Sequence, residues 1–289
     1  MNMRPPFRPF EDVAEPFRIG LSPLDPAHML LVDDRRDREL ALKRRLWTEE
    51  RDAVFVAEAD TQDAQAAVAD LVVANLVEHH GLRVALDDIP PLAAAALVVQ
   101  EDLLVMRRAT EGWRLVAGSL SFPSSWSLAQ KFGRTLHSIH VPVPGVNARM
   151  DVRIARMFDH MRVPLWRQNW SLQNDDALRV VREEGERGGH DNVGDAGDGN
   201  GNGDGDRGLR LRMEYQTLTR LPSGPPPGDL LFTVRILLDP LKALANRRRL
   251  AAGLLERIGA MSEAERGYKG LAPRLADLRT ALRCIAEAT

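Results

Sequence analysis

The stretch "ALVVQEDLLVMRRATEGWRLVAGSLSFPS" (96–124) decides the fold class that we predict for this chain. Two runs rich in valine and leucine, "ALVVQEDLLVMRR" and "GWRLVAGSLSFPS", lie on either side of "ATEG", whose length suits a hairpin turn. We therefore predict two antiparallel strands here. Three more strands are predicted from later runs of the same kind, "LWRQNWSLQ" (165–173), "GLRLRMEYQTLTRLP" (208–222) and "DLLFTVRILLDPL" (229–241).

Helical patterns surround these strands. Before the hairpin they cover residues 33–55 and 60–82, and the second of these closes at Gly81, a common residue at helix ends. Between the second and third strands we predict helices in "SWSLAQKFG" (125–133) and "NARMDVRIARMFDHMR" (147–162), the latter with a clear apolar face. Two more helices are predicted after the last strand, within 246–265 and 271–288.

This order of elements predicts an α+β fold, with a PAS-like five-stranded antiparallel sheet, crossover helices, and helical extensions at both ends. A PAS fold binds haem or flavin between its crossover helices and its sheet. The Gly/Asp/Asn-rich tract 185–207 has almost no apolar side chains, so we expect a disordered insertion there. The predicted domains are an extended arm (1–35), an N-terminal helical extension (36–83), a PAS-like core (92–242) and C-terminal helices (243–289).

Composition excludes several classes of protein. The formal net charge is −2, with both signs spread along the chain, which gives no support to binding of nucleic acid or of an anionic membrane. The single cysteine, Cys284, rules out an internal disulfide, and we expect it on the buried face of the last helix. No signal-peptide pattern is present, and the longest apolar run (92–99) is too short to span a membrane. We therefore expect a cytoplasmic protein.

Eight segments carry a resemblance to a known family. They are "FRIGLSPLDP" (17–26), "LALKRRL" (40–46), "QEDLLVMRR" (100–108), "GWRLVAGSLSFPSSW" (112–126), "KFGRTLHSIHVPVPG" (131–145), "WRQNWSL" (166–172), "QTLTRLP" (216–222) and "YKGLAP" (268–273). In this order they resemble the haem-dependent oxidative N-demethylase family, and specifically its haem-binding subunit. The resemblance runs from about residue 5 to 275.

The resemblance implies a PAS-like protein that binds haem b and uses O2 to oxidise a methylated secondary or tertiary amine, with release of formaldehyde. It also implies that electrons come from NADPH through separate flavin and iron–sulfur subunits. The sequence has no G-x-G-x-x-G after a strand and too few cysteines for a cluster. We therefore expect no flavin or iron–sulfur cluster in this chain, and a separate reductase as its partner.

Histidine is the best candidate for the haem ligand among the residue types that bind haem iron. Four of the seven histidines lie in the N-terminal arm, at a polar helix end or in the Gly/Asp-rich tract: His28, His79, His80 and His190. His160 lies off the apolar stripe of its helix and is expected to be exposed. That leaves His137 and His140 in "HSIHVPVPG" (137–145), a turn between two helices.

We predict that His140 binds the iron and keep His137 as the alternative. Pro142 and Pro144 follow directly after His140 and stiffen the backbone, which suits a ligand whose ring must keep one orientation. A histidine that only forms hydrogen bonds in a proline-rich turn is the competing interpretation.

The segment "WRQNWSL" (166–172) predicts a second group of functional residues. On a strand Trp166, Gln168 and Trp170 share one face, and Arg167 and Asn169 share the other. Arg167 or Gln168 could contact a haem propionate or bound oxygen. The competing interpretation is a half-exposed strand with aromatic cross-strand packing.

Glu214 and Gln216 share a face of the next strand, as do Tyr215 and Thr217. The Glu214 carboxylate could bind an amine cation or accept a proton during oxidation, although a solvent-facing glutamate explains the pattern as well. Arg18 and Arg114 are candidates to neutralise haem propionates, and both could equally be structural ion-pair partners.

A second class of function stays open from sequence. The same fold and cofactor would serve a non-enzymatic PAS-type haem protein that binds or senses O2 or another gas, or a module that assembles with partner chains. A relative that has lost its haem site is a third possibility. No output domain such as a kinase or a DNA-binding module is evident, which favours the enzyme.

Overall fold

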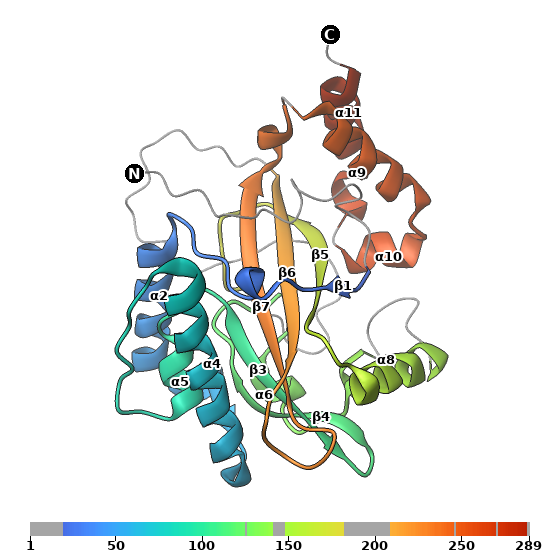
Figure 1. The fold of residues 1–289 in the computed structure, drawn as a ribbon. Coiled ribbons are helices and arrows are strands. Elements are labelled where there is room, and N and C mark those ends of the chain that lie inside the picture. Colours follow the sequence, from blue (N-terminus) through green and yellow to red (C-terminus); the bar gives the residue numbers. More distant parts are fainter. Residues whose placement is uncertain are drawn as a thin grey trace.

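The computed structural model describes residues 20–124, 126–140, 148–181, 209–245, 247–269 and 271–287. They form an α+β structure around one antiparallel seven-stranded sheet, with strand order β1-β5-β6-β7-β3-β4-β2 (Figure 1). The strands are β1 (Ser22–Pro23), β2 (Phe55–Ala57), β3 (Asp102–Ala109), β4 (Gly112–Ser119), β5 (Leu165–Gln173), β6 (Arg210–Arg220) and β7 (Leu230–Pro240).

All five predicted strands are confirmed, and so is the α+β class. The sheet has two strands more than predicted, β1 and β2, and both are too short to produce an alternating pattern. The start of the first predicted strand is wrong, because residue 96 ends a helix, α5 (Pro91–Ala96), and β3 begins only at Asp102. Hydrophobic periodicity alone does not distinguish a short buried helix from a short buried strand. Here the helix begins at Pro91, a residue that is common at the first helical position.

The helices flank the strands in the predicted order. The α-helices besides α5 are α2 (Arg36–Glu49), α3 (Arg51–Val54), α4 (Gln62–His80), α6 (Leu128–Lys131), α7 (Leu136–His140), α8 (Ala148–His160), α9 (Arg248–Ala260), α10 (Glu263–Tyr268) and α11 (Leu275–Glu287). Helix α4 ends as predicted at Gly81, whose φ of 64° lies in the left-handed region. The helix predicted over 125–133 is only the four-residue α6, which begins at the capping box of Ser127 and Gln130.

The two faces of the sheet bury different helices. Leu103 and Val105 of β3 point to a large core that includes apolar residues of α4, α5, α9 and α11. Leu104 and Met106 point to the opposite face, where they pack with residues of α6, α7 and α8. Figure 1 shows α2, α4 and α5 grouped at one side of the sheet, α9 to α11 at one end, and α8 near β4 and β5.

Three further observations bear on the predictions from sequence. Cys284 is exposed, so the prediction that it is buried is wrong; it lies on the outer side of α11, whose buried residues are Leu278 and Leu282. No helix within the described part of the chain is both long and apolar enough to cross a membrane. The tract 185–207, Arg18 and the prolines at 142 and 144 lie outside the described residues.

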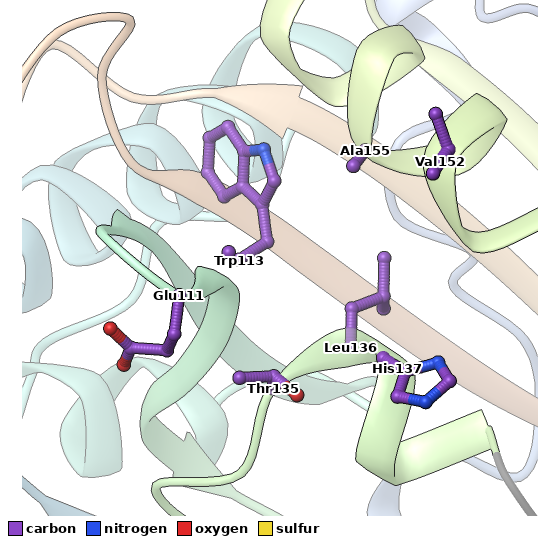
Figure 2. A pocket seen from close by; sticks show the side chains of 8 residues that line it. Glu111, Trp113, Thr135, Leu136, His137, Val152 and Ala155 are labelled. Carbon is purple, nitrogen blue, oxygen red and sulfur yellow. The ribbon is translucent and has the colours of Figure 1, made fainter. Parts of the chain in front are cut away.

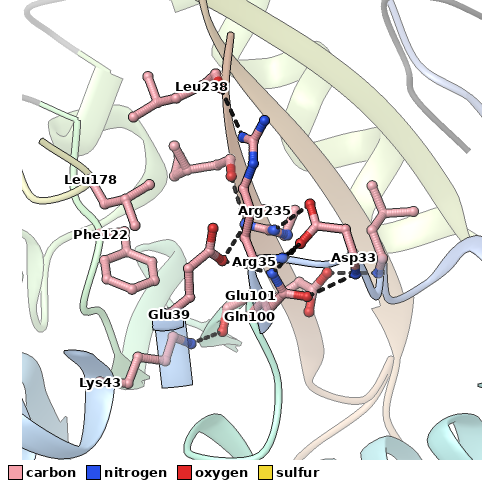
Figure 3. Close-up of polar contacts among 12 residues, drawn as sticks. Asp33, Arg35, Glu39, Lys43, Gln100, Glu101, Phe122, Leu178, Arg235 and Leu238 are labelled. Carbon is pink, nitrogen blue, oxygen red and sulfur yellow. Dashed lines mark hydrogen bonds and ion pairs between the residues drawn. The ribbon is translucent and has the colours of Figure 1, made fainter. Parts of the chain in front are cut away.

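A buried ionic network fixes α2 and the segment before it to the sheet (Figure 3). Arg235 of β7 is fully buried, and its guanidinium pairs with Asp33 at 3.0 Å and with Glu39 at 2.8 Å. The side-chain amide of Gln100 donates to the same two carboxylates, at 2.7 and 2.8 Å. Burial raises the pKa of Glu39, although the charge of Arg235 opposes that rise.

A second part of the network lies one turn further along α2. Lys43 donates to the backbone carbonyls of Ala96 and Glu101, and its ammonium is 3.7 Å from Asp102. Asp102 accepts from the backbone N–H groups of Ser121 and Phe122. Buried charges of this kind are tolerated only when they are paired and hydrogen-bonded, so the network specifies where α2 docks.

Gly224→Ala is expected to lower the free energy of unfolding by about 2–3 kcal/mol. Gly224 has φ of 75°, and a Cβ built there would overlap the carboxylate of Asp229, which holds Arg107 through two hydrogen bonds of 2.9 Å. Gly81→Ala is the matched control, because Gly81 is also left-handed and has open space around it. It should cost only about 1 kcal/mol. Urea denaturation measures both, and equal losses would show that Asp229 moves aside freely.

Candidate functional site

The predicted site residues of β5 and β6 meet through the register of these strands. Asn169 pairs with Glu214 across the two strands, and Arg167 pairs with Gln216. Because side chains alternate along a strand, these four residues share one face of the sheet. Leu218, two residues beyond Gln216, belongs to the cluster that packs against α7 and α8. The predicted polar residues therefore lie on the same face of the sheet as α7 and α8.

A chain of hydrogen bonds converges on one oxygen of Glu214. Gln216 Nε2 donates to Glu214 Oε2 at 2.9 Å, and Asn169 Nδ2 makes a longer contact of 3.4 Å with the same oxygen. Behind Asn169 lies Lys269, which directly follows α10. Its Nζ donates to Asn169 Oδ1 at 3.0 Å and to the carbonyl of Trp170 at 2.6 Å. We call Arg167, Asn169, Glu214, Gln216 and Lys269 the β5–β6 polar site.

Lys269 is the charged residue of this site that sequence reasoning missed. It is buried, and burial lowers the pKa of its ammonium to about 8; the charge of Glu214 opposes this shift and that of Arg167 adds to it. The ammonium also lies 4.8 Å from the centre of the Trp170 ring, a cation–π distance. The only signal for it in the sequence is its place in "YKGLAP" (268–273), one of the segments of the family resemblance.

Gln168 lies on the opposite face of β5 from Arg167 and Glu214. It is buried there together with Trp170. On the same face the ring of Trp166 lies 5.5 Å from that of Tyr215, whose hydroxyl donates to the carbonyl of His28 at 2.9 Å. The structure therefore brings Arg167 and Glu214 to one face and separates Gln168 from both.

Arg114 lies on β4, on the other side of β7 and β3 from β5 and β6. Its guanidinium forms a two-pronged ion pair with Glu58, and its Nε is 3.7 Å from Glu111. These carboxylates raise the pKa of Arg114, the hydrogen bonds of Glu58 contributing most. The structure thus gives Arg114 carboxylate partners within the chain, outside the β5–β6 polar site.

Both candidate haem ligands lie on α7, a single helical turn, whereas the sequence predicted a turn without helix. The segment before α7 is tied to β4, because Gly133 N–H donates to the Leu115 carbonyl at 2.9 Å and Leu115 N–H donates to that of Arg134 at 3.2 Å. His137 has an exposed side chain, and His140 is the last residue of the helix.

A partly open pocket of about 280 Å³ lies between the β3–β4 turn, α7 and α8 (Figure 2). In Figure 2 the side chain of Leu136 points into the space between Trp113 and α8, and the imidazole of His137 lies at its edge. The lining residues are mostly apolar: Glu111, Gly112, Trp113, Thr135, Leu136, His137, Val152 and Ala155. Trp113 is fixed by a hydrogen bond of 2.9 Å to Asp159 of α8. This arrangement joins the hairpin, α7 and α8 into one apolar wall beside a histidine.

The fold and site define an α+β protein whose antiparallel sheet carries a hydrogen-bonded carboxylate on one face, with a buried lysine beside it. A histidine-bearing helix, α7, packs elsewhere on the same face. Residues 78–276 match the family described as haem-dependent oxidative N-demethylase, alpha subunit-like. The chain therefore belongs to this family. The match includes the β5–β6 polar site and both histidines of α7, and begins after the first two segments of the resemblance. No curated protein sequence matches the chain.

Proposed function

We propose that this chain is the haem-binding subunit of an enzyme that removes a methyl group oxidatively from a secondary or tertiary amine. In the balanced reaction the N-methyl amine, O2, two electrons and two protons give the demethylated amine, formaldehyde and water. One oxygen atom enters formaldehyde and the other enters water, and the C–N bond is broken. The single observation that carries this proposal is the family match over residues 78–276.

The donor types present fit a haem. Imidazole is a common axial ligand of haem iron, and α7 carries two histidines next to an apolar wall that includes Leu136 and Trp113. We propose His140 as the residue that holds the iron, with His137 as the alternative. The bound haem b would supply the activation of O2; the chain would supply the binding and orientation of the amine.

Glu214 is the residue that we propose to bind the amine. A methylated amine is a cation at neutral pH, and Glu214 is the one carboxylate of the β5–β6 polar site. Both hydrogen bonds that Glu214 accepts from described residues reach Oε2, which leaves Oε1 for a ligand. Arg167, on the same face, is proposed to contact a propionate or bound oxygen. Gln168 is buried on the opposite face of β5 and would stabilise the strand there. Arg114 already forms an ion pair with Glu58.

We propose further that the five central strands form a PAS-like core. The support for this proposal is their order across the sheet, β4-β3-β7-β6-β5, which is the order expected for a PAS domain, with α6 to α8 as the proposed crossover. The proposed core covers residues 92–242, between the helical extensions 36–83 and 243–289. The arm (1–35) and the first extension each supply a strand, β1 and β2, to the edges of the sheet.

The electron donor in this proposal is a separate chain. The family description names an alpha subunit, which supports the existence of partner subunits. We propose that a reductase with flavin and iron–sulfur centres passes electrons from NADPH to the haem.

The proposal is tested by titrating the purified full chain with haemin and recording absorption spectra. We expect a sharp Soret band that saturates at one haem per chain. With a chemical reductant, O2 and methylated amines, one formaldehyde should then form for each amine consumed. A saturable Soret band without formaldehyde for any of a panel of amines would favour a non-enzymatic haem protein. No specific band would overturn both functions.

A further inference from the structure

We propose that Lys269 is a positioning residue for Glu214, which it serves by fixing the side-chain amide of Asn169. This inference rests on the proposed function and deepens it, because it concerns how the same site recognises an amine. Lys269 lies 100 residues from Asn169 along the chain, so the contact is a product of the fold.

The orientation of the Asn169 amide follows from the chemistry of its two neighbours. An ammonium only donates hydrogen bonds, so the atom of Asn169 that faces Lys269 at 3.0 Å must be Oδ1. The NH2 group is then turned toward Glu214, where it can donate to Oε2 together with Gln216. If Lys269 did not hold Oδ1, the amide could rotate and present an oxygen to the carboxylate. Lys269 thus selects the one orientation that stabilises a Glu214 anion.

The ammonium of Lys269 also contributes to the net charge of the site that we propose to bind the amine. The charged groups that face Lys269 are Glu214, Arg167, Arg257 and Glu265. Within the β5–β6 polar site one carboxylate therefore faces two cations as long as Lys269 is protonated. Because burial lowers the pKa of Lys269 to about 8, its charge is lost between pH 6.5 and 9.5, while carboxylates and guanidiniums as classes keep theirs. A neutral lysine still donates to Asn169.

Two effects can therefore be separated. Raising the pH removes the charge of Lys269 and keeps the hydrogen bond, so an ammonium ligand should bind more tightly. Substituting the lysine by methionine removes both. A comparison of wild type with Lys269→Met at pH 9.5, where neither side chain is charged, isolates the effect of positioning.

The competing explanation is that Lys269 is purely structural and only satisfies a backbone carbonyl of β5. Lys269 Nζ also donates to the carbonyl of Trp170, and this bond alone could account for its burial. A purely structural lysine would change the stability of the chain when it is replaced. At pH 9.5, where the lysine is uncharged, its replacement would not weaken the binding of a permanent cation.

The probe is tetramethylammonium, whose charge does not change with pH. Its binding to the full chain loaded with haemin is measured by calorimetry at pH 6.5 and 9.5. For wild type we expect about 5-fold tighter binding at pH 9.5. Lys269→Gln, which keeps an amide donor, should show no dependence on pH. Lys269→Met should bind about 10-fold more weakly than wild type at pH 9.5, again without dependence on pH.

Two controls make the result decisive. Lys242→Met replaces an exposed lysine of η3 (Leu241–Leu244) and should keep the pH dependence of wild type. Glu214→Gln should abolish binding, which establishes the amine site independently of Lys269. Wild-type affinity in Lys269→Met at pH 9.5 overturns the positioning role of Lys269 while the proposed function stands, and equal wild-type affinity at both pH values overturns the effect of its charge. If wild type binds no probe at either pH, the proposed amine site itself fails. Should Lys269→Met not fold, Lys269→Ala takes its place in the comparison at pH 9.5, with the same expected loss of affinity.

Discussion

Arg235→Leu is expected to lower the free energy of unfolding by about 4 kcal/mol at neutral pH. The guanidinium is fully buried and pairs with Asp33 and Glu39, so its removal leaves two carboxylates in the interior without their cation. Leucine replaces most of the apolar stem, so the loss reports the charge more than a cavity. Urea denaturation of the full chain, followed by far-UV circular dichroism, gives the difference.

The matched control is Arg44→Met. Arg44 lies on α2, and its partner Asp87 is 3.2 Å away, but both side chains are about half exposed, 51% and 54%. An exposed ion pair contributes little because water solvates both charges, so the control should lose no more than about 0.5–1 kcal/mol. Similar losses in the two variants would contradict a special role for the buried network. If Arg235→Leu does not fold, Arg235→Lys keeps the charge and should fold with a smaller loss.

The loss in Arg235→Leu should also depend on pH in a definite direction. Burial already raises the pKa of Glu39 in the wild type, against the opposing charge of Arg235. Without Arg235 the pKa of Glu39 rises further, so the folded variant binds a proton at a pH where the folded wild type does not. Since the folded variant takes up more protons, the difference in stability between the two proteins should shrink as pH falls from 7 toward 5. A difference that stays constant over this range would show that Glu39 keeps its charge without Arg235.

Much of the sheet could be predicted because strand signals are local. The alternation in "WRQNWSLQ" predicted which residues of β5 share a face, and the strand register, ring contact and hydrogen bond of the structure fit that division. The hairpin of β3 and β4 followed from two apolar runs and one short turn. Strands β1 and β2 could not be predicted in this way, since two or three residues define no period.

The candidate site was only half predictable, because its other half depends on register and on distant contacts. The sequence placed Glu214 beside Gln216 on one strand. It contained nothing to indicate that Asn169 lies opposite Glu214, or that Lys269 reaches Asn169 from a loop after α10. A sequence does not distinguish a buried lysine such as Lys269 from a surface lysine. The opposite error occurred at Cys284, which was predicted to be buried because its neighbours are apolar and is in fact exposed.

His140→Ala is expected to weaken haem binding by about 100-fold or more, with loss of the sharp Soret band. On a helix each residue advances by about 100° around the axis, so residues 136, 139 and 140 of α7 fall on one face. Leu136 and Ile139 pack against the cluster on the sheet, whereas His137 is exposed. Position 140 therefore lies nearer than position 137 to the side of α7 that faces the sheet.

His137→Ala is the matched control, a histidine of the same helix one turn away. It should keep the Soret band and lose less than about 3-fold in haem affinity, because an exposed imidazole at the edge of the pocket is not expected to bind the iron. Haemin titrations followed by absorption compare the three proteins, and external imidazole should restore the band of His140→Ala if a ligand position has been vacated. If the band were lost only in His137→Ala, His137 would be the iron ligand. His140 would then have only a structural role at the end of α7.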